Sequence, residues 1–382
     1  MMRRRVLASV VVWVVGFGVL RVSLLAPEVC PPVEPGAALS AAVAAGDWLA
    51  AGQGSDGRYL YELDRSSGQP QPGYNIVRHA GVTMSLYELA AAGAPGALDA
   101  ADRGLELMLD GLVPAGVGRA LVEPGSSSAR LGASALMAAA LLERREATAD
   151  RRYDDELHDL GRFMTAQLGP GGSMLASYDL VADARVEETS RYATGEAGWA
   201  LARLHTAFPG EGWDRPARAV ADYLSTTRDE AEGLDFRPWP DQWAAYLLAE
   251  LAPDGLAEHH VAYARQLAAR FSMLVRVESQ KDGWPTPFVD AHARAAGLGV
   301  WLEGLGSLVQ VAEADERLAD LQPALEERLA CGAGLLIERQ VDDGPAVEIG
   351  AWFRAGSTRM DDQQHAVSGL LAAEALVTGS EP

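Results

Sequence analysis

Lysine is almost absent from this chain, and cysteine is scarce. Lys281 is the one lysine among 382 residues, and Cys30 and Cys331 are the two cysteines. Two widely separated cysteines form no paired-cysteine metal motif, but they allow one disulfide in an oxidising compartment. Cys30 precedes the first expected helix of the folded domain and Cys331 lies in the last expected hairpin. A ring that closes on itself would bring the two together.

Common catalytic motifs are also missing. The chain contains no HExxH, paired CxxC, GxSxG, P-loop or dinucleotide glycine fingerprint. These patterns mark zinc peptidases, serine hydrolases, nucleotide enzymes and NAD enzymes, so all four classes are disfavoured. We therefore expect no cofactor and no metal.

Acidic residues exceed basic ones throughout the part of the chain that follows residue 26. Four of the 32 basic residues lie before that point and none of the 53 acidic residues does, which leaves 28 basic residues and a net charge of −25. Such a field repels nucleic acids and anionic lipid headgroups. We expect no nucleic-acid partner.

The N-terminus has the pattern of an export signal. MMRRR precedes the uncharged run Val6–Leu20, and Arg21 and the apolar run Val22–Ala26 follow. A basic segment followed by an apolar one is typical of a secretory signal or a signal anchor. Because no good Ala-x-Ala site follows Leu25, an uncleaved transmembrane anchor over residues 1–26 is favoured over a cleaved signal. Either interpretation places the later residues outside the cytoplasm, periplasmic or extracellular.

Beyond a Pro-rich linker at residues 27–36, the chain repeats. Similar helix ends occur near Gln53, Gln167, Gln280 and Gln340, and weaker ones lie near Asp110 and Ser225. Six breaks at a spacing of roughly 57 residues indicate an internal repeat of one supersecondary unit. The repeats occupy residues 37–378 and leave a short tail at 379–382.

Two kinds of helix alternate between these breaks. One kind is amphipathic, and the other is apolar on all sides and rich in Ala and Gly, as in Leu131–Leu142. A helix that is apolar all round is surrounded by protein, whereas a helix with a polar stripe faces water. The expected amphipathic helices are 37–52, 101–110, 151–167, 213–224, 257–280 and 314–340, and the expected apolar helices are 75–92, 130–144, 194–207, 241–251, 293–312 and 361–377. The sequence therefore predicts an all-α fold, an (α/α)6 toroid with an inner and an outer ring.

Connection lengths predict where a site would lie. Turns from an inner to the next outer helix are short, whereas the links 53–74, 111–128, 168–190 and 341–358 are long. Loops beyond about 12–15 residues in a compact domain are usually functional or disordered. All the long links fall on the face where the six inner helices begin, so their amino ends should line a central funnel.

Polar side chains cluster at these expected helix starts. The opening of the first inner helix, YNIVRHAG, and the opening of the last, TRMDDQQHA, place arginine, histidine and acids at the funnel mouth. Carboxylates, imidazoles, guanidinium groups and aromatic rings suit a hydroxyl-rich ligand such as a sugar. The candidate ligand-binding residues are Tyr74, Asn75, Asp64, Arg78, Arg191, Trp239, Gln242, Trp284, His292 and Arg359, and the candidate catalytic residues are His79, Tyr192, Glu196, Asp241, Asp361 and His365.

Structural roles compete with these assignments. Asp241 after Pro240 fits an ordinary helix start, Asp361 fits a capping box with Thr358, and Glu196 in a first turn favours the helix dipole. His79 and His365 lie deep enough to be satisfied core histidines. Tyr74 and Asn75 fit a staple and a cap. The alternation in RYLYEL, residues 58–63, predicts a short strand or hairpin at the funnel rim.

Over residues 37–378, the alternating helices and long one-sided loops resemble the six-hairpin glycosidase-like toroids, which include glycoside hydrolases, polysaccharide lyases and sugar epimerases. The resemblance implies a site in the funnel at the long-loop face. QKDGW, residues 280–284, is similar to a shortened QW repeat of triterpene cyclases, although no DxDD motif is present. Lanthionine cyclases are also toroids, but their zinc-binding Cys and His motifs are missing.

These observations favour an extracytoplasmic, membrane-anchored enzyme acting on a glycan or glycoconjugate. Hydrolysis would need two carboxylates across the scissile bond, with Glu196 and Asp241 as the first pair and Asp361 or Asp64 as substitutes. Elimination or epimerisation would instead use His79, Tyr192 and His365, with Arg78 and Arg191 neutralising a uronate. A non-catalytic glycan- or partner-binding scaffold and a terpenoid-cyclase-like toroid are the alternatives.

Overall fold

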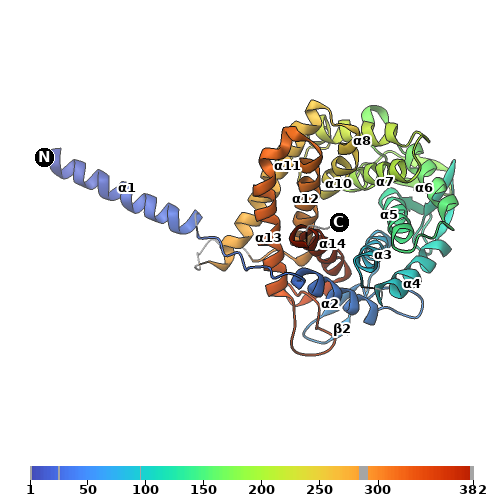
Figure 1. Ribbon diagram of the computed structural model, residues 1–382, viewed down its shortest axis with the longest axis horizontal. Helices are drawn as coiled ribbons and strands as arrows, with labels where there is room; N and C mark the ends of the chain where they lie inside the picture. The colour runs from blue at the N-terminus through green and yellow to red at the C-terminus, as the bar shows by residue number, and fades with distance from the viewer. Residues whose placement is uncertain (1, 25, 95, 284–290, 379–382) are drawn as a thin grey trace.

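Helical hairpins form two concentric rings in the computed structural model, which describes residues 2–24, 26–94, 96–283 and 291–378 (Figure 1). The inner helices are α3 (Ile76–Ala91), α5 (Leu131–Thr148), α7 (Ala193–Ala207), α10 (Gln242–Leu251), α12 (Ala295–Ala314) and α14 (Met360–Thr378). The outer helices are α2 (Ala37–Ala51), α4 (Gly96–Asp110), α6 (Asp154–Ala166), α8 (Asp214–Thr226), α11 (Glu258–Ser279) and α13 (Gln322–Arg339). The predicted (α/α)6 toroid is confirmed.

The inner ring closes because its helices pack against one another in sequence order. Each contacts the next, from α3 through α5, α7, α10 and α12 to α14, and α14 contacts α3 again. Small residues allow this close approach. A Cβ built at Gly299 of α12 would lie 2.3 Å from the carbonyl carbon and oxygen of His365 in α14. Almost every residue of α5 up to Arg144 is buried, as its uniformly apolar sequence predicts.

Helix boundaries differ from the expectation at two outer helices. α4 begins at Gly96, several residues before the expected start. The segment expected to form one helix from Ala314 to Gln340 is divided into a 3-10 helix, Glu316–Leu321, and α13. Asp315 caps the 3-10 helix through the backbone N–H of Arg317, and Pro323 occupies the first turn of α13. A proline is tolerated at a helix start but not in its interior, so the chain begins a new helix there.

The long connections carry short strands on the face where the inner helices begin. β1 (Glu62–Asp64) lies between β2 (Gln69–Pro70) and β8 (Ser357–Arg359), so the first and last long links are joined. The strand or hairpin predicted from residues 58–63 is present only at the end of that stretch, where β1 begins and pairs with β2. The other strands are β3 (Leu112–Ala115) paired with β4 (Gly118–Leu121), and β5 (Ser128–Arg130), β6 (Ser177–Asp179) and β7 (Ala184–Val186) in a second three-stranded sheet. The short helix α9 (Arg228–Ala231) and the 3-10 turns Pro170–Gly172 and Gln280–Asp282 lie in other outer-to-inner links, and the 3-10 turn Ala252–Asp254 lies in the short turn between α10 and α11.

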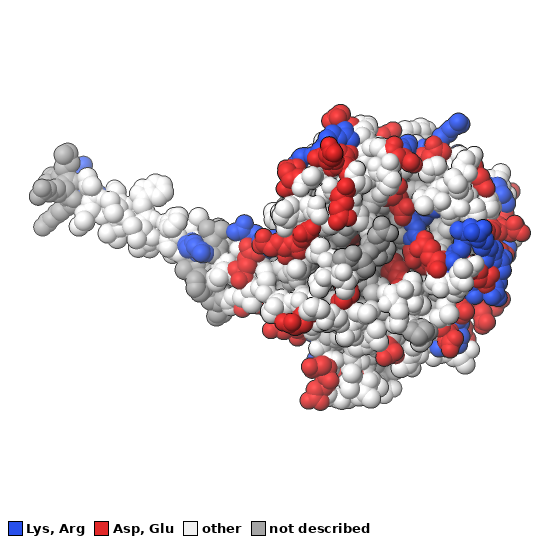
Figure 2. Space-filling model, viewed as in Figure 1, with Lys and Arg blue, Asp and Glu red and all other residues white. Residues whose placement is uncertain are grey.

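The helix α1 (Met2–Leu24) projects from the ring, and its described side chains from Val6 to Leu20 are mostly exposed and uncharged (Figures 1 and 2). Acidic and basic side chains are instead spread over the ring (Figure 2). Among the described residues, α12 has the length and hydropathy of a membrane span, but 78% of its most apolar window is buried in the ring. Burial explains the composition of α12, and anchoring by α1 stays a prediction.

The segment between α1 and the ring packs along α11 and α13. The Val29 N–H donates to the Ser279 carbonyl at 3.1 Å, and Glu28 pairs with Arg276 and Arg328. Cys30 and Cys331 form a disulfide across a sequence separation of 301 residues. The pairing allowed by the sequence is confirmed, and it fastens the entry segment to the last outer helix.

Candidate active site

A central cavity of about 930 Å³ opens where the inner helices begin. Residues from the first turns of all six inner helices line it, together with loop residues that precede α3, α5 and α7. The volume lies in the range of small-molecule sites, about 300–1,000 Å³. Of the sixteen candidate residues, eight line this cavity: Asn75, Arg78, Tyr192, Glu196, Trp239, Gln242, Asp361 and His365.

Glu196 presents a buried carboxyl group to the cavity from the first turns of α7. A Cβ built at Gly132 would lie 2.1 Å from Glu196 Oε2, so the glycine in α5 makes room for this carboxyl. Burial raises the pKa of Glu196 to about 8; the Asp241 carboxylate adds to the shift and His365 partly offsets it. The carboxyl group is therefore protonated at neutral pH.

His365 lies in α14, and its ring forms a hydrogen bond with a buried acid. Its Nδ1 lies 3.1 Å and 3.0 Å from the Oε1 and Oε2 atoms of Glu303 in α12. Burial alone would lower the pKa of His365, but the charge of Glu303 and the hydrogen bond to it outweigh burial and raise that pKa. The imidazole is thus stabilised in its protonated form beside Glu196.

Arg78 and Asp361 face each other across the mouths of α3 and α14. The Arg78 Nε lies 3.5 Å from Asp361 Oδ2, and Arg359 Nη2 lies 3.1 Å from the same oxygen. Arg78 also donates from Nη1 to the Tyr61 hydroxyl at 2.6 Å. The other oxygen, Asp361 Oδ1, is buried and has no protein hydrogen-bond partner among the described residues. An ion-paired carboxylate thus keeps one acceptor for a ligand.

Aromatic and amide side chains complete the cavity wall. Trp239, Trp243 and Trp301 contribute indole rings, and Gln242 and Gln364 contribute amides. Within the described part of the chain, three of their buried polar atoms have no partner: Trp239 Nε1, Gln242 Oε1 and Gln364 Nε2. Buried polar groups are normally hydrogen-bonded. Unpaired donors and acceptors around a cavity fit a ligand rich in hydroxyl groups.

Asp241 does not line the cavity, although it was the expected partner of Glu196. Its Oδ1 accepts from the backbone N–H groups of Trp243 and Ala244 and so caps α10, and its Oδ2 accepts from the buried Arg228. Both oxygens are engaged and the side chain is fully buried. Asp241 therefore has the role of an ordinary helix start, as its position after Pro240 predicts.

His79 also lies outside the cavity lining, in the wall between α3 and α4. Its Nε2–H donates to the Gly104 carbonyl at 2.8 Å, and its Nδ1 accepts from the Tyr74 hydroxyl. Burial lowers the pKa of His79 to about 4, so the ring is neutral. With both nitrogens satisfied, His79 and Tyr74 have the structural role that the sequence left open. Asn75 caps α3 through the N–H groups of Val77 and Arg78 while also lining the cavity.

The remaining candidates are scattered around the rim. Asp64 is held in an exposed turn by Ser66 and Ser67. Arg191 lies 4.9 Å from the Trp239 ring centroid, and Arg359 reaches the cavity through Asp361. His292 lies in a different cavity beside Glu278 and Asp282. Trp284 lies outside the described residues.

Sequence reasoning missed Glu303, Trp301 and Gln364. Glu303 had a detectable signal, since it is the one acid within the apolar stretch from Ala293 to Ala312. An acid in an otherwise apolar helix needs a partner, and here that partner is His365. Trp301 and Gln364 carried no comparable signal, because their direction depends on how each helix is rotated about its axis.

A second cavity of about 680 Å³ adjoins the first over the rim of α4 and the β3–β4 hairpin. Ser126 lines both cavities, and a small intervening pocket shares Glu123 with the second cavity and Ser128 with the first. Arg58, Arg103 and the acids Glu106 and Asp110 line the outer part. The two cavities therefore meet at Ser126, and polar side chains line both of them.

Comparison with solved structures identifies proteins that have a similar architecture. The cellobiose 2-epimerase of Spirochaeta thermophila is similar with a TM-score of 0.64 at 14% identity, covering 89% of this chain and 96% of the epimerase. The chain has the six-hairpin glycosidase-like fold. An α-1,6-mannanase from a Salegentibacter species matches with a TM-score of 0.61 at 11% identity, covering 89% and 99%. A heparin-specific unsaturated glucuronyl hydrolase matches with a TM-score of 0.60 at 12% identity, covering 90% and 98%.

These structural neighbours are carbohydrate-active enzymes, and an inactive variant of the mannanase has been solved with a mannotetraose. No protein-family model matches the chain, and no curated protein is similar to it in sequence. At these identities the likeness concerns the fold.

Proposed function

We propose that this protein is a glycoside hydrolase whose active site is the central cavity, with Glu196 as the general acid and Asp361 as its carboxylate partner. The observation that carries the proposal is that a protonated carboxyl group and an ion-paired carboxylate line the same polar cavity. Glycoside hydrolysis needs one carboxyl that donates a proton to the leaving oxygen and one carboxylate that activates water or attacks the sugar.

The surroundings of Glu196 and of Asp361 suit the role that each residue is assigned. Burial keeps the Glu196 proton in place at neutral pH, as a general acid requires. Arg78 and Arg359 form ion pairs with Asp361 Oδ2, and the unpaired Asp361 Oδ1 is available to a water or a sugar. The rings of Trp239 and Trp301 provide stacking surfaces for pyranose faces. Glu303 stabilises the protonated form of His365, and a protonated His365 beside Glu196 would stabilise the carboxylate that remains after proton donation.

The second cavity supports an oligosaccharide substrate rather than a monosaccharide. It meets the central cavity at Ser126 and extends to Arg58 and Arg103, so it offers room for further sugar units. We expect kcat/KM to rise with oligosaccharide length until both cavities are filled, and we expect Arg103→Ala to reduce that dependence while sparing the shortest substrate.

A glycan panel containing uronate-bearing and neutral polysaccharides tests the proposal, with new reducing ends and the absorbance of unsaturated products as readouts. We expect reducing ends without unsaturated products. Glu196→Gln and Asp361→Asn should each lower kcat by at least about 10³-fold, because each removes the proton donor or the charge the reaction needs. Asp64→Asn changes a half-buried acid that does not line the cavity; this variant is the control and should retain full turnover. Equal turnover in all three variants would contradict the assignment.

Epimerisation is the second candidate, because His365 is a histidine at the cavity wall with a buried acid behind it. A proton abstracted from a sugar carbon needs a neutral base, whereas Glu303 favours the charged imidazole. This ranks epimerisation below hydrolysis. Incorporation of solvent deuterium at a sugar carbon, without new reducing ends, would reverse the order.

A binding scaffold and a terpenoid cyclase fit the cavity less well. A scaffold has no need of a buried neutral acid beside unpaired polar atoms, and a hydrocarbon ligand would leave Asp361, Gln242 and Gln364 unsatisfied. We further propose that α1 anchors the enzyme in a membrane with the ring outside the cytoplasm. The exposed apolar run Val6–Leu20 and the Cys30–Cys331 disulfide support this location.

A further inference from the structure

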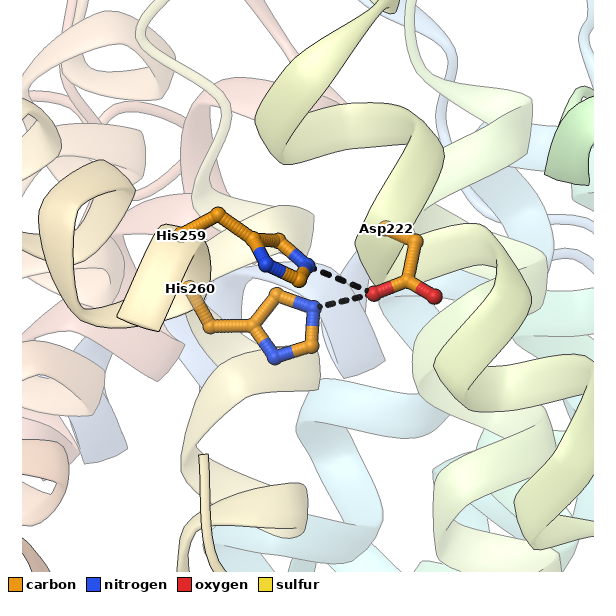
Figure 3. A group of neighbouring side chains, drawn as sticks. All are labelled: Asp222, His259 and His260. Carbon is orange, nitrogen blue, oxygen red and sulfur yellow. Dashed lines mark hydrogen bonds and ion pairs between the residues drawn. The ribbon is translucent and has the colours of Figure 1, made fainter. Parts of the chain in front are cut away.

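Two histidines and an aspartate converge on the outer wall of the ring, away from the central cavity. Asp222 comes from α8, and His259 and His260 are adjacent residues in the first turn of α11 (Figure 3). Both imidazoles point toward one carboxylate oxygen: His259 Nε2 lies 2.7 Å and His260 Nε2 lies 2.9 Å from Asp222 Oδ1. The three ligand atoms lie within 4.8 Å of one another.

The side chains differ in how they are held. His260 is 2% exposed, so surrounding protein fixes its ring, whereas His259 and Asp222 have side chains 42% and 56% exposed and open to solvent. The His260 Nε2 makes no hydrogen bond of normal geometry within the described part of the chain, despite its short distance to Asp222. A buried nitrogen that lies near Asp222 without a well-formed hydrogen bond, beside two accessible ligand atoms, leaves an open approach for an ion.

We propose that Asp222, His259 and His260 form a binding site for a divalent zinc ion. Two imidazole nitrogens and one carboxylate oxygen are a ligand set that zinc accepts at about 2.0–2.2 Å, with water in the fourth position. Coordination at that distance requires the three ligand atoms to change their present spacing, and the exposed side chains of His259 and Asp222 leave room for that movement. The ion would join α8 to α11 and so connect the fourth and fifth hairpins of the ring.

Three features of the surroundings disfavour a bound cation, and the effect of each is small. The amino end of α11 carries a partial positive charge, which the Asp222 carboxylate offsets. Arg218 lies one turn before Asp222, but its Nη1 donates to the Gly255 carbonyl at 3.0 Å and its Nη2 lies 4.0 Å from Asp254. Ligation through His260 Nε2 places the ring proton on Nδ1 and breaks a long contact of 3.4 Å from the Ala257 N–H.

Zinc titration of the full-length protein in detergent tests this proposal without a glycan. Calorimetry at pH 7.5 and about 0.15 M salt, where non-specific attraction to the acidic surface is screened, should show one saturable site that EDTA reverses. Thermal unfolding should shift to higher temperature with zinc and remain unchanged with an equal concentration of magnesium. No saturable binding in the intact protein would overturn the proposal.

Three variants locate the site. His259→Ala and Asp222→Asn change exposed ligands without opening the core, and each should weaken zinc binding by about tenfold or more. His205→Ala is the matched control, since His205 lies in α7 and pairs with a single acid, Asp254, at 3.2 Å. Equal zinc affinity in all three variants would also overturn the proposal, because the ion would then bind elsewhere.

Discussion

Glu196 is the central residue of the proposed chemistry, because its environment keeps its carboxyl group neutral at a pH where most carboxyl groups are charged. The first turn of α7 buries it against Gly132, and the Asp241 carboxylate lies behind it. The sequence proposed Glu196 and His365, which both line the cavity, and paired Glu196 with Asp241, which does not line it. Asp241 and Asp361 both lie at inner-helix starts, and only side-chain direction shows that one caps α10 while the other faces the ligand space.

The pH dependence of turnover should report the Glu196 proton. Because the pKa of Glu196 is raised to about 8, the general acid is present at pH 6–7 and is lost as pH rises through about 8. We expect kcat to fall about tenfold per pH unit above that value, measured on the best substrate of the panel. A flat profile from pH 7 to pH 9.5 would contradict this role.

Stability should depend on the same proton. The folded state holds it more tightly than the unfolded chain, whose glutamates titrate near 4.5, so the stabilisation is present below that value and is lost as pH rises toward about 8. Glu196→Gln has no such proton to lose. Its stability relative to the natural protein should therefore increase by on the order of 3 kcal/mol between pH 5 and pH 7.5, measured by urea unfolding. Parallel curves for the two proteins would show that Glu196 titrates normally.

At the scale of elements, the inner helices are predictable because a helix that is surrounded by protein needs an unusual composition. A helix enclosed on all sides must be apolar, and neighbours that approach closely must carry Gly or Ala, as α5, α12 and α14 do. Connection lengths then placed the cavity on the correct face. The rotation of each inner helix about its axis could not be predicted from the sequence. A helix that is apolar on all sides has no polar face to show which residues point toward the cavity.

Gly299 and Gly297 offer a matched test of this packing within α12. A Cβ at Gly299 would lie 2.3 Å from backbone atoms of His365, whereas a Cβ at Gly297 would meet nothing nearer than 3.9 Å. Gly299→Ala should destabilise the protein by about 3 kcal/mol, since backbone must move to admit the methyl group. Gly297→Ala should be neutral or stabilising by up to about 1 kcal/mol, as alanine favours a helix. Equal denaturation midpoints for the two variants would contradict the close α12–α14 contact.

For the whole molecule, the ring places residues that are distant in sequence side by side. β1 pairs with β8, α14 packs against α2 and α3, and Cys30 bonds to Cys331. The internal repeat made this closure predictable, since six hairpins curving in one direction return to their start. The cavity beyond Ser126 was not predictable, because it depends on how the loop residues 55–58 and 122–126 lie against α4.

The disulfide should stabilise the closed ring by limiting the unfolded chain. Replacing Cys30 and Cys331 together by serine should lower the free energy of unfolding by about 2–4 kcal/mol. The same loss should follow reduction of the natural protein, and the double variant should be insensitive to reductant. Stability that does not change on reduction would show that the bond contributes nothing to the folded ring.

A crystal structure of the Glu196→Gln variant soaked with the best oligosaccharide of the panel tests the central claim most directly. We expect a glycosidic oxygen within hydrogen-bonding distance of the residue 196 amide, and an anomeric carbon or its attacking water beside Asp361. The side chains of residues 196 and 361 should then lie about 5–9.5 Å apart across the bond. A sugar bound outside the central cavity, or carboxyl groups of these two residues that do not flank the bond, would contradict it.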